Sequence, residues 1–329
     1  MVEKGVILQK DRDVVFNELP PYPKNMQMEL TNFCNHRCVF CGYESMKRPK
    51  RKCDKELMLD VLRQAYDLGT REVGFYMIGE TFIIDDVEDY IKEAKRLGYT
   101  YIYITTNGVL ADLPKVIGCY RAGLNSIKYS INGSNRSEYE RMHGKDDFDV
   151  VKKNIEDLKE YISKNSIEDL GVFISFIKTE WNKNNIDELY TQFGELVDQI
   201  YIWDCKIQGG GLDTDNLIKK GIMKKENLIS LGGYPCPMLF NRFHVTCEGI
   251  LDACCVDFGY EMAVADLREV SLKDAWNSEA MKEIRRKHIS GSIENTYCYN
   301  CVFIKNEDVS PINPILAQNL YSRNGECYE

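Results

Sequence analysis

Residues 26–41, MQMELTNFCNHRCVFC, join a short apolar stretch to a loop with three cysteines in eight residues. The stretch MQMEL is typical of the end of a β-strand, and Cys34, Cys38 and Cys41 follow it on a loop. Core cysteines are usually buried singly, so three thiols on one loop indicate a metal site. Structural zinc sites close four ligands in paired knuckles, whereas three thiolates without a near fourth favour an iron–sulfur cluster with one open iron.

The composition is that of a globular protein with a full hydrophobic core. The chain has 329 residues and a formal net charge of −9, which argues against general nucleic-acid binding. No apolar run is long enough to cross a bilayer, and the N-terminus MVEKGVILQKDRD lacks the apolar core of a secretory signal. We therefore expect a cytoplasmic protein without membrane partners. Its thirteen cysteines would stay reduced there, so clustered ones indicate metal ligands or catalytic groups.

Strand and helix patterns alternate from residue 26 to residue 204. The apolar patterns predict strands at 26–30, 72–77, 100–105, 126–131, 171–177 and 199–203, and helices at 55–68, 87–97, 113–123, 149–162 and 185–197. Such alternation predicts a parallel sheet with right-handed crossovers. Six strands suit a partial barrel or an open doubly wound sheet. In both folds, ligands bind at the carboxyl ends of the strands.

After Trp203 the alternation stops. The stretch KIQGGGLD, residues 206–213, is predicted to be a turn at a domain boundary rather than a phosphate-binding loop. Residues 236–301 hold six of the thirteen cysteines, a hairpin pattern at 243–257 and a helix pattern at 271–288. A core of this size is too thin to stand alone, so a metal centre would help to hold it together.

The loop of the first three cysteines resembles the signature of the radical S-adenosylmethionine enzymes, Cys-x3-Cys-x-aromatic-Cys, with Phe40 as the aromatic residue. The resemblance implies a partial (β/α)6 barrel and a four-iron four-sulfur cluster bound by Cys34, Cys38 and Cys41. In that family the open iron chelates S-adenosylmethionine. One electron then cleaves the sulfonium, and the resulting 5′-deoxyadenosyl radical abstracts a substrate hydrogen. An electron donor such as flavodoxin or ferredoxin is implied as a partner.

Three further strand ends resemble positions at which that family contacts S-adenosylmethionine. The sequence IGET after the second strand resembles the Gly-Glu motif that meets the methionine amine, although Thr81 stands where the family often has proline. Taken singly, each position could equally be an ordinary turn, but their order on successive strand ends favours a site. The residues implied to bind the cofactor are Phe40, Gly79, Glu80, Thr106, Asn107, Ser130 and Asn132.

The second cysteine group resembles the twitch module, a shortened form of the auxiliary-cluster module called SPASM. Cys236 and Cys254 flank seventeen residues, and Cys298-x2-Cys301 follows after 43 more. The words CCVD and SLKDAW are also typical of that module. The resemblance implies one auxiliary four-iron four-sulfur cluster, held by Cys236, Cys254, Cys298 and Cys301.

Two alternatives stay open for the second group. The same four thiolates could hold a structural zinc ion, and Cys255 could replace Cys254 as the ligand. A second auxiliary cluster is not expected, because Glu307 stands where the full SPASM pattern would continue with a cysteine. The predicted organisation is an N-terminal extension (1–25), a barrel core (26–205), a linker (206–235), an auxiliary-cluster module (236–310) and a C-terminal tail (311–329).

The remaining cysteines and charges are less informative. Cys205 lies just past the sixth strand and is either a small buried residue or a thiol that donates hydrogen. The basic run at residues 47–52 is expected to be a solvated face, or else a gate that attracts an anionic substrate. The four histidines show no ligand spacing, and His36 is expected to pack or be solvated. Cys53, Cys119 and Cys327 are expected to be bystanders, and Cys247 a core residue.

The resemblance implies a radical enzyme that oxidises a small sugar- or aminocyclitol-like substrate. In such dehydrogenases the auxiliary cluster binds substrate or accepts the second electron. A carbohydrate epimerase is one alternative, with Cys205 as its hydrogen donor. A maturase of ribosomally made peptides is another, ranked second because residues 1–25 leave no room for the winged-helix domain that many maturases carry. A non-enzymatic iron–sulfur or zinc protein is the last alternative.

Overall fold

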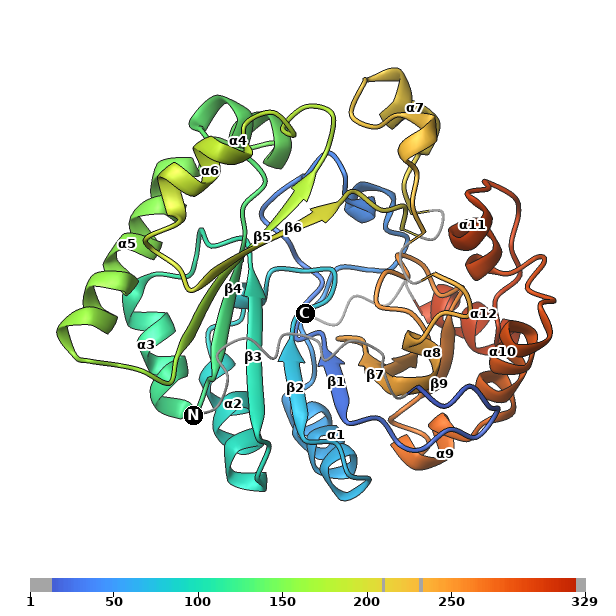
Figure 1. Cartoon of the computed structure of the whole chain (residues 1–329). Coiled ribbons are helices and arrows are strands. Elements are labelled where there is room, and N and C mark those ends of the chain that lie inside the picture. Colours follow the sequence, from blue (N-terminus) through green and yellow to red (C-terminus); the bar gives the residue numbers. More distant parts are fainter. Residues whose placement is uncertain (1–13, 209–210, 231–232, 324–329) are drawn as a thin grey trace.

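The computed structural model describes residues 14–208, 211–230 and 233–323 (Figure 1). Most of the predicted N-terminal extension, two glycines of the stretch 206–213 and Cys327 lie outside the described residues. In the described part, nine strands form one sheet in the order β6-β5-β4-β3-β2-β1-β7-β8-β9. No helix in that part is long and apolar enough to cross a membrane.

The six predicted strands are present, and neighbouring strands pair in parallel in the order of the sequence. They are β1 (Asn25–Met28), β2 (Glu72–Phe75), β3 (Tyr101–Thr106), β4 (Ser126–Ser130), β5 (Gly171–Lys178) and β6 (Gln199–Asp204). The predicted helices are α1 (Lys55–Asp67), α2 (Val87–Leu97), α3 (Leu113–Ala122), α5 (Phe148–Lys164) and α6 (Ile186–Phe193). They lie outside the curved sheet (Figure 1). The predicted partial barrel is confirmed.

Local sequence sets the ends of these helices. Asp54 and Asp112 each accept a hydrogen bond at 3.1 Å from the backbone N–H three residues on, which caps α1 and α3. Gly98 ends α2 with a φ of 105°, a conformation that strains other residues. Such caps depend on adjacent residues only, and the sequence therefore predicts them well.

Two helical regions differ from the sequence prediction. Helix α4 (Arg136–His143) was not expected, because its eight residues are mostly polar and show little apolar periodicity. The helix predicted over 271–288 is two helices, α9 (Leu272–Trp276) and α10 (Glu279–Ser290). The break occurs because Ser278 caps α10 by accepting a hydrogen bond from the N–H of Met281, and an N-cap residue cannot continue the preceding helix.

The second module continues the sheet of the barrel. Strand β7 (Arg242–Val245) pairs in parallel with β1, so β1 lies between β2 and β7. Strands β8 (Ile250–Asp252) and β9 (Ala263–Asp266) extend the sheet with antiparallel pairing (Figure 1). Phe243 and Trp276 of the module belong to the same apolar core as Met26 and Met28 of the barrel. The module therefore does not rely on a thin core of its own.

The rest of the module and the chain around it are helical. Short helices α7 (Thr214–Lys219) and α8 (Met238–Asn241) precede β7. Helices α11 (Tyr297–Phe303) and α12 (Pro314–Arg323) follow α10. Helix α12 packs against β9 through a small apolar cluster that includes Tyr260 and Leu320. The residues after 311, predicted to be a tail, therefore pack on the module over their described part.

Side chains alternate between the two faces of the barrel sheet. Met26, Val73, Ile104 and Ile127 lie in the core between sheet and helices. The residues between such positions point to the concave side, which we call the inner face. They include Gln27, Tyr76, Tyr103, Thr105, Lys128, Ser130, Tyr201 and Arg242. Six of these eight are half-buried rather than fully buried, so the inner face keeps access to solvent.

A buried ion network fastens the module to the barrel. Arg48 is 2% exposed, and its guanidinium donates to both carboxylate oxygens of Glu248, at 3.0 and 2.6 Å, and to Glu29. Glu29 follows β1, and Glu248 lies in the turn between β7 and β8. The expectation of a solvated basic run or a gate is therefore wrong at Arg48. The sequence pattern could not reveal this because the two carboxylates come from distant segments.

Replacing Arg48 should destabilise the fold far more than replacing its neighbour Lys47. Arg48→Ala leaves two buried carboxylates without their cation, which costs about 3–5 kcal/mol. Lys47 pairs with Glu261 at 2.9 Å but its side chain is 66% exposed, so Lys47→Ala should cost about 0–1 kcal/mol. Urea unfolding of the metal-free proteins, followed by circular dichroism, measures both. Equal losses would contradict a fastening role for the network.

Candidate active site

The loop after β1 gathers the first three cysteines, and α4 holds it in place. The N–H groups of Arg37 and Val39 donate to the carbonyls of His143 and Met142, at 3.1 and 3.0 Å. The N–H of Cys41 donates to the carbonyl of Cys38 at 3.0 Å, which turns the loop back on itself. Helix α4, which the sequence pattern missed, is therefore the support of this loop.

The three thiols lie close enough for their charges to act on one another. Burial raises the pKa of Cys38 well above its usual value, and the neighbouring charges of Cys41 and Cys34 raise it further. Burial raises the pKa of Cys41 to about 11. Thiolates gathered in such a place need a cation to offset their repulsion, and a bound metal provides one. The donor set therefore fits an iron–sulfur cluster with three protein thiolates.

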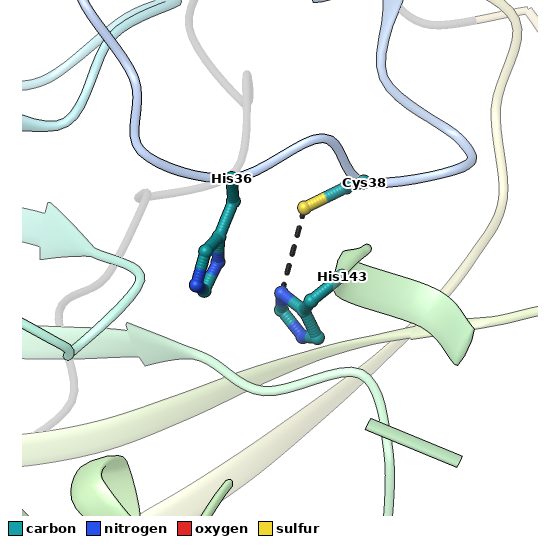
Figure 2. Close-up of side chains that lie close together, drawn as sticks. All are labelled: His36, Cys38 and His143. Atoms are coloured by element: carbon teal, nitrogen blue, oxygen red, sulfur yellow. Dashed lines mark hydrogen bonds between the residues drawn. The ribbon is translucent and has the colours of Figure 1, made fainter. Parts of the chain in front are cut away.

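A histidine supports one of these thiols (Figure 2). The backbone N–H of Asn132 donates to Nε2 of His143 at 3.0 Å, so the ring proton lies on Nδ1. Nδ1 is 3.4 Å from Sγ of Cys38 and donates to it. His143 therefore acts as a hydrogen-bond donor to Cys38 rather than as a metal ligand. His36 lies beside this pair, is buried, and contacts Asp147 at 3.0 Å. Of the two expectations for His36, packing or solvation, the structure therefore supports packing.

The predicted cofactor residues after β2 and β3 meet next to the cluster loop. A side chain at Gly79 would put its Cβ 2.1 Å from the carbonyl oxygen of Thr31, so only glycine fits there. Glu80 is buried, and accepts hydrogen bonds at 2.7 Å from the hydroxyl of Thr106 and from the N–H of Asn107. Burial raises the pKa of Glu80. The carboxylate thus joins two strand ends within reach of the cysteine loop.

Of the other three predicted cofactor residues, one lies within the loop and two lie at and just after the end of β4. Phe40 packs beside the apolar cluster that contains Cys205. Ser130 is half-buried at the end of β4. The amide oxygen of Asn132 accepts from the N–H of Ile177 at 2.6 Å, so this oxygen is already used within the fold. Their contacts with S-adenosylmethionine stay predictions.

Cys205 lies beyond β6 and lines a pocket of about 400 Å³. The pocket lies at the ends of β5 and β6 and has both signs of charge, with Lys178 paired to Asp204 at 2.7 Å. Burial raises the pKa of Cys205 to about 12, so its thiol keeps its proton. Cys205 therefore is both a buried residue and a lining residue, and its role as a hydrogen donor stays a prediction.

The second cysteine group lines one small pocket of the module. Its four members are Cys236 before α8, Cys254 after β8, and Cys298 and Cys301 one turn apart on α11. Burial and the charges of Cys236 and Cys301 raise the pKa of Cys298 well above its usual value. Cys255 is not among the described residues that line the pocket, which favours Cys254 as the ligand. Four thiols converging on one pocket fit a second metal centre.

Removing each cysteine group should remove one cluster. We expect the anaerobically reconstituted chain to bind about eight irons, from two four-iron clusters. Replacing Cys34, Cys38 and Cys41 by alanine should leave about four irons and abolish cleavage of S-adenosylmethionine, because no open iron remains. Replacing Cys298 and Cys301 should leave about four irons but retain that cleavage in the absence of substrate.

Iron analysis and chromatography of 5′-deoxyadenosine measure these outcomes. Cys53→Ala is the matched control and should leave both clusters intact, because Cys53 belongs to neither cysteine group: its thiol hydrogen-bonds to the hydroxyl of Tyr90 at 3.3 Å and packs against the apolar core. Cleavage by the triple variant would overturn the assignment of the first loop. Zinc in place of iron in the second site would overturn the assignment of the auxiliary cluster.

Two family models match the chain. The model of the radical SAM superfamily matches residues 28–190, and that of the iron–sulfur cluster-binding SPASM domain matches residues 236–302. Each matched segment contains one of the two cysteine groups, and strands of both segments belong to the same sheet.

Curated relatives match part of the chain. A "Probable GTP 3′,8-cyclase" of Saccharolobus islandicus is 30% identical over 174 residues, which cover 53% of this chain and 52% of the relative. The "PqqA peptide cyclase" of Gluconobacter oxydans is 33% identical over 127 residues, covering 38% of this chain and 35% of the relative. The chain thus spans about half the length, or less, of the curated relatives it matches.

Solved structures share the fold at low identity. Streptococcus suis SuiB bound to precursor peptide SuiA has a TM-score of 0.62 and 17% identity, covering 80% of this chain and 67% of SuiB. BtrN in complex with AdoMet and 2-DOIA has a TM-score of 0.54 and 16% identity, covering 87% and 96%. The anSMEcpe enzyme with bound AdoMet has a TM-score of 0.61 and 14% identity, covering 92% and 96%.

These matches agree with the cysteine motifs and with the order of the strands. The cofactors of the two matched domains are S-adenosylmethionine and four-iron four-sulfur clusters, one of which is auxiliary. The chain belongs to the radical SAM superfamily and carries a SPASM-type iron–sulfur domain.

Proposed function

We propose that this chain is a dehydrogenase that oxidises a small sugar- or cyclitol-like substrate and uses its auxiliary cluster as the electron acceptor. One observation carries the proposal: the auxiliary site borders the inner face of the barrel. Burial raises the pKa of Tyr76 on the inner face, and the nearby charge of Cys255, which follows Cys254 of the auxiliary pocket, raises it further. A substrate on the inner face would therefore lie near both cysteine sites.

The residues near the first cluster have distinct proposed roles. Cys34, Cys38 and Cys41 hold the cluster, and bound S-adenosylmethionine supplies a radical that removes a hydrogen atom from a substrate carbon. Glu80 is proposed to accept the methionine amine, because it is a buried carboxylate next to the loop. The close approach of Gly79 to Thr31 keeps that carboxylate in place. An external donor such as flavodoxin or ferredoxin is proposed to supply the first electron.

The auxiliary cysteines have the role of a second redox site. Removing a hydrogen atom leaves a substrate radical, and a dehydrogenase must still take away one proton and one electron. We propose Cys236, Cys254, Cys298 and Cys301 as the ligands of the group that takes the electron. The pairing of β7 with β1 supports this role, because it keeps the pocket at a constant position relative to the inner face.

A peptide maturase is the second candidate. It is favoured by the PqqA peptide cyclase among the curated relatives and by the fold shared with SuiB. The small-molecule proposal is preferred because the single auxiliary cysteine set matches the expectation of one cluster. The mutual coverage of 87% and 96% with BtrN, solved with AdoMet and 2-DOIA, supports the same choice at the level of the fold.

The deciding experiment follows hydrogen at the substrate carbon. Reconstituted protein, S-adenosylmethionine and a reductant are incubated in heavy water with a panel of sugars and aminocyclitols, and 5′-deoxyadenosine formation identifies the substrate. Oxidation should yield a product lighter by two hydrogens with no deuterium on carbon, because a proton and an electron leave the substrate radical. Mass spectrometry measures both, and Cys205→Ala should be nearly as active as the parent chain.

Two other outcomes would overturn the dehydrogenase. Deuterium on carbon that disappears in Cys205→Ala would make the chain an epimerase, because thiol protons exchange with water. Turnover of a precursor peptide but of no sugar or cyclitol would favour the maturase.

A further inference from the structure

Lys128 is an unpaired cation on the inner face of the barrel. It lies on β4, directly opposite Thr105 of β3 and Phe173 of β5, and two residues before Ser130. Among the described residues it forms no ion pair, and its nearest recorded partner is the ring of Tyr76, with Nζ 5.9 Å from the centroid. The hydroxyl of Thr105 beside it is buried and has no hydrogen-bond partner in the described part of the chain.

A second cation strengthens the positive field at this place. Burial, and after it the positive charge of Arg242 on β7, lowers the pKa of Lys128 to about 8. An anion next to the Lys128 ammonium would offset both the lost hydration and the repulsion. An unused hydroxyl donor next to Lys128 suits the oxygens of such an anion.

We propose that Lys128 and Thr105, in a positive field to which Arg242 contributes, bind a negatively charged group of the substrate, either a phosphate or a carboxylate. This inference rests on the proposed function and narrows its substrate class. Within the sugar- and cyclitol-like compounds it selects acidic or phosphorylated members. It disfavours aminocyclitols, because their ammonium groups would meet two cations.

The test uses one sugar ring with four different charges. Glucose, glucosamine, glucuronate and glucose 6-phosphate are titrated calorimetrically into the reconstituted protein with S-adenosylmethionine, at constant ionic strength. The two anionic sugars should bind at least tenfold more tightly than glucose. Lys128→Met should lose that preference, and Lys153→Met, which removes an exposed lysine paired with Asp157 at 2.9 Å on α5, should keep it.

Three results would overturn the anion site: equal binding of the neutral or amino sugar, no binding of either anion, or a preference that survives in Lys128→Met. The tighter binder of glucuronate and glucose 6-phosphate shows whether the site prefers a carboxylate or a phosphate. Cleavage of S-adenosylmethionine without substrate is measured on the same samples. Its loss would instead count against the radical function itself.

A separate observation concerns His288 in the auxiliary pocket. This residue of α10 is 1% exposed and lines the pocket together with the four cysteines. Its Nδ1 accepts a hydrogen bond at 3.3 Å from the backbone N–H of Cys236, so the ring proton lies on Nε2. Nε2 is buried and has no hydrogen-bond partner among the described residues. Buried donors are rarely left unsatisfied, so a partner in this pocket is expected.

We infer that Nε2–H of His288 donates a hydrogen bond to the auxiliary cluster and raises its reduction potential. A donor next to the cluster sulfurs stabilises the reduced form, which carries more negative charge. His288 is thus a positioning residue that makes the auxiliary cluster a better electron acceptor. The inference rests on the proposed auxiliary ligands and on no assumption about the substrate.

Redox titration followed by electron paramagnetic resonance tests the role of His288. His288→Phe should lower the potential of the auxiliary cluster, and His288→Gln, which retains a side-chain N–H, should restore part of it. The potential of the first cluster in the same protein is the internal control and should not move. An unchanged auxiliary potential in a fully iron-loaded His288→Phe would overturn the inference.

Iron content separates the two possible failures. If the parent chain binds only one cluster, the proposed auxiliary site is wrong. If only His288→Phe fails to load, His288→Met takes its place as the variant without a side-chain N–H: an auxiliary potential below that of the parent supports the hydrogen bond, and an unchanged potential overturns it.

Discussion

Strand β1 carries both metal sites, because it pairs with β2 on one side and with β7 on the other. Its carboxyl end leads into the loop of the first three cysteines, and β7 leads through its hairpin to Cys254. Backbone hydrogen bonds on both edges of one strand leave little freedom between the two sites. The relative position of the cysteine groups therefore follows from sheet pairing and not from the chain that connects them in sequence.

Buried charge adds a second constraint at the same junction. Arg48 lies between Glu29 and Glu248, next to the end of β1 and in the hairpin after β7. A buried ion pair adds little free energy of folding compared with apolar packing, but breaking it is costly. The network therefore favours one arrangement of module and barrel over others. Phe258 of the module packs with Tyr43 of the cluster loop beside Cys34 and Cys41, which extends the contact to the first metal site.

The two cysteine sites share one arrangement, a buried histidine whose tautomer is fixed by a backbone N–H. In each, a backbone N–H occupies one nitrogen of a buried histidine, from Asn132 to His143 and from Cys236 to His288. The ring proton must then lie on the other nitrogen, which is next to Cys38 in the first site and has no partner among the described residues in the second. A neutral imidazole held in this way donates to sulfur without competing with iron for the thiolates.

The sequence by itself determined the six barrel strands with their intervening helices, most helix ends and the two cysteine groups, because these depend on periodicity and on spacing between near neighbours. It did not predict α4, whose short polar sequence is stable because its end binds the cluster loop. Nor could it bring Arg48 to Glu248, His288 to Cys236 or Lys128 to the vicinity of Arg242. Only the tertiary structure decided these contacts, because they join strands and helices that lie far apart in the chain, and such contacts exist only once the sheet has paired.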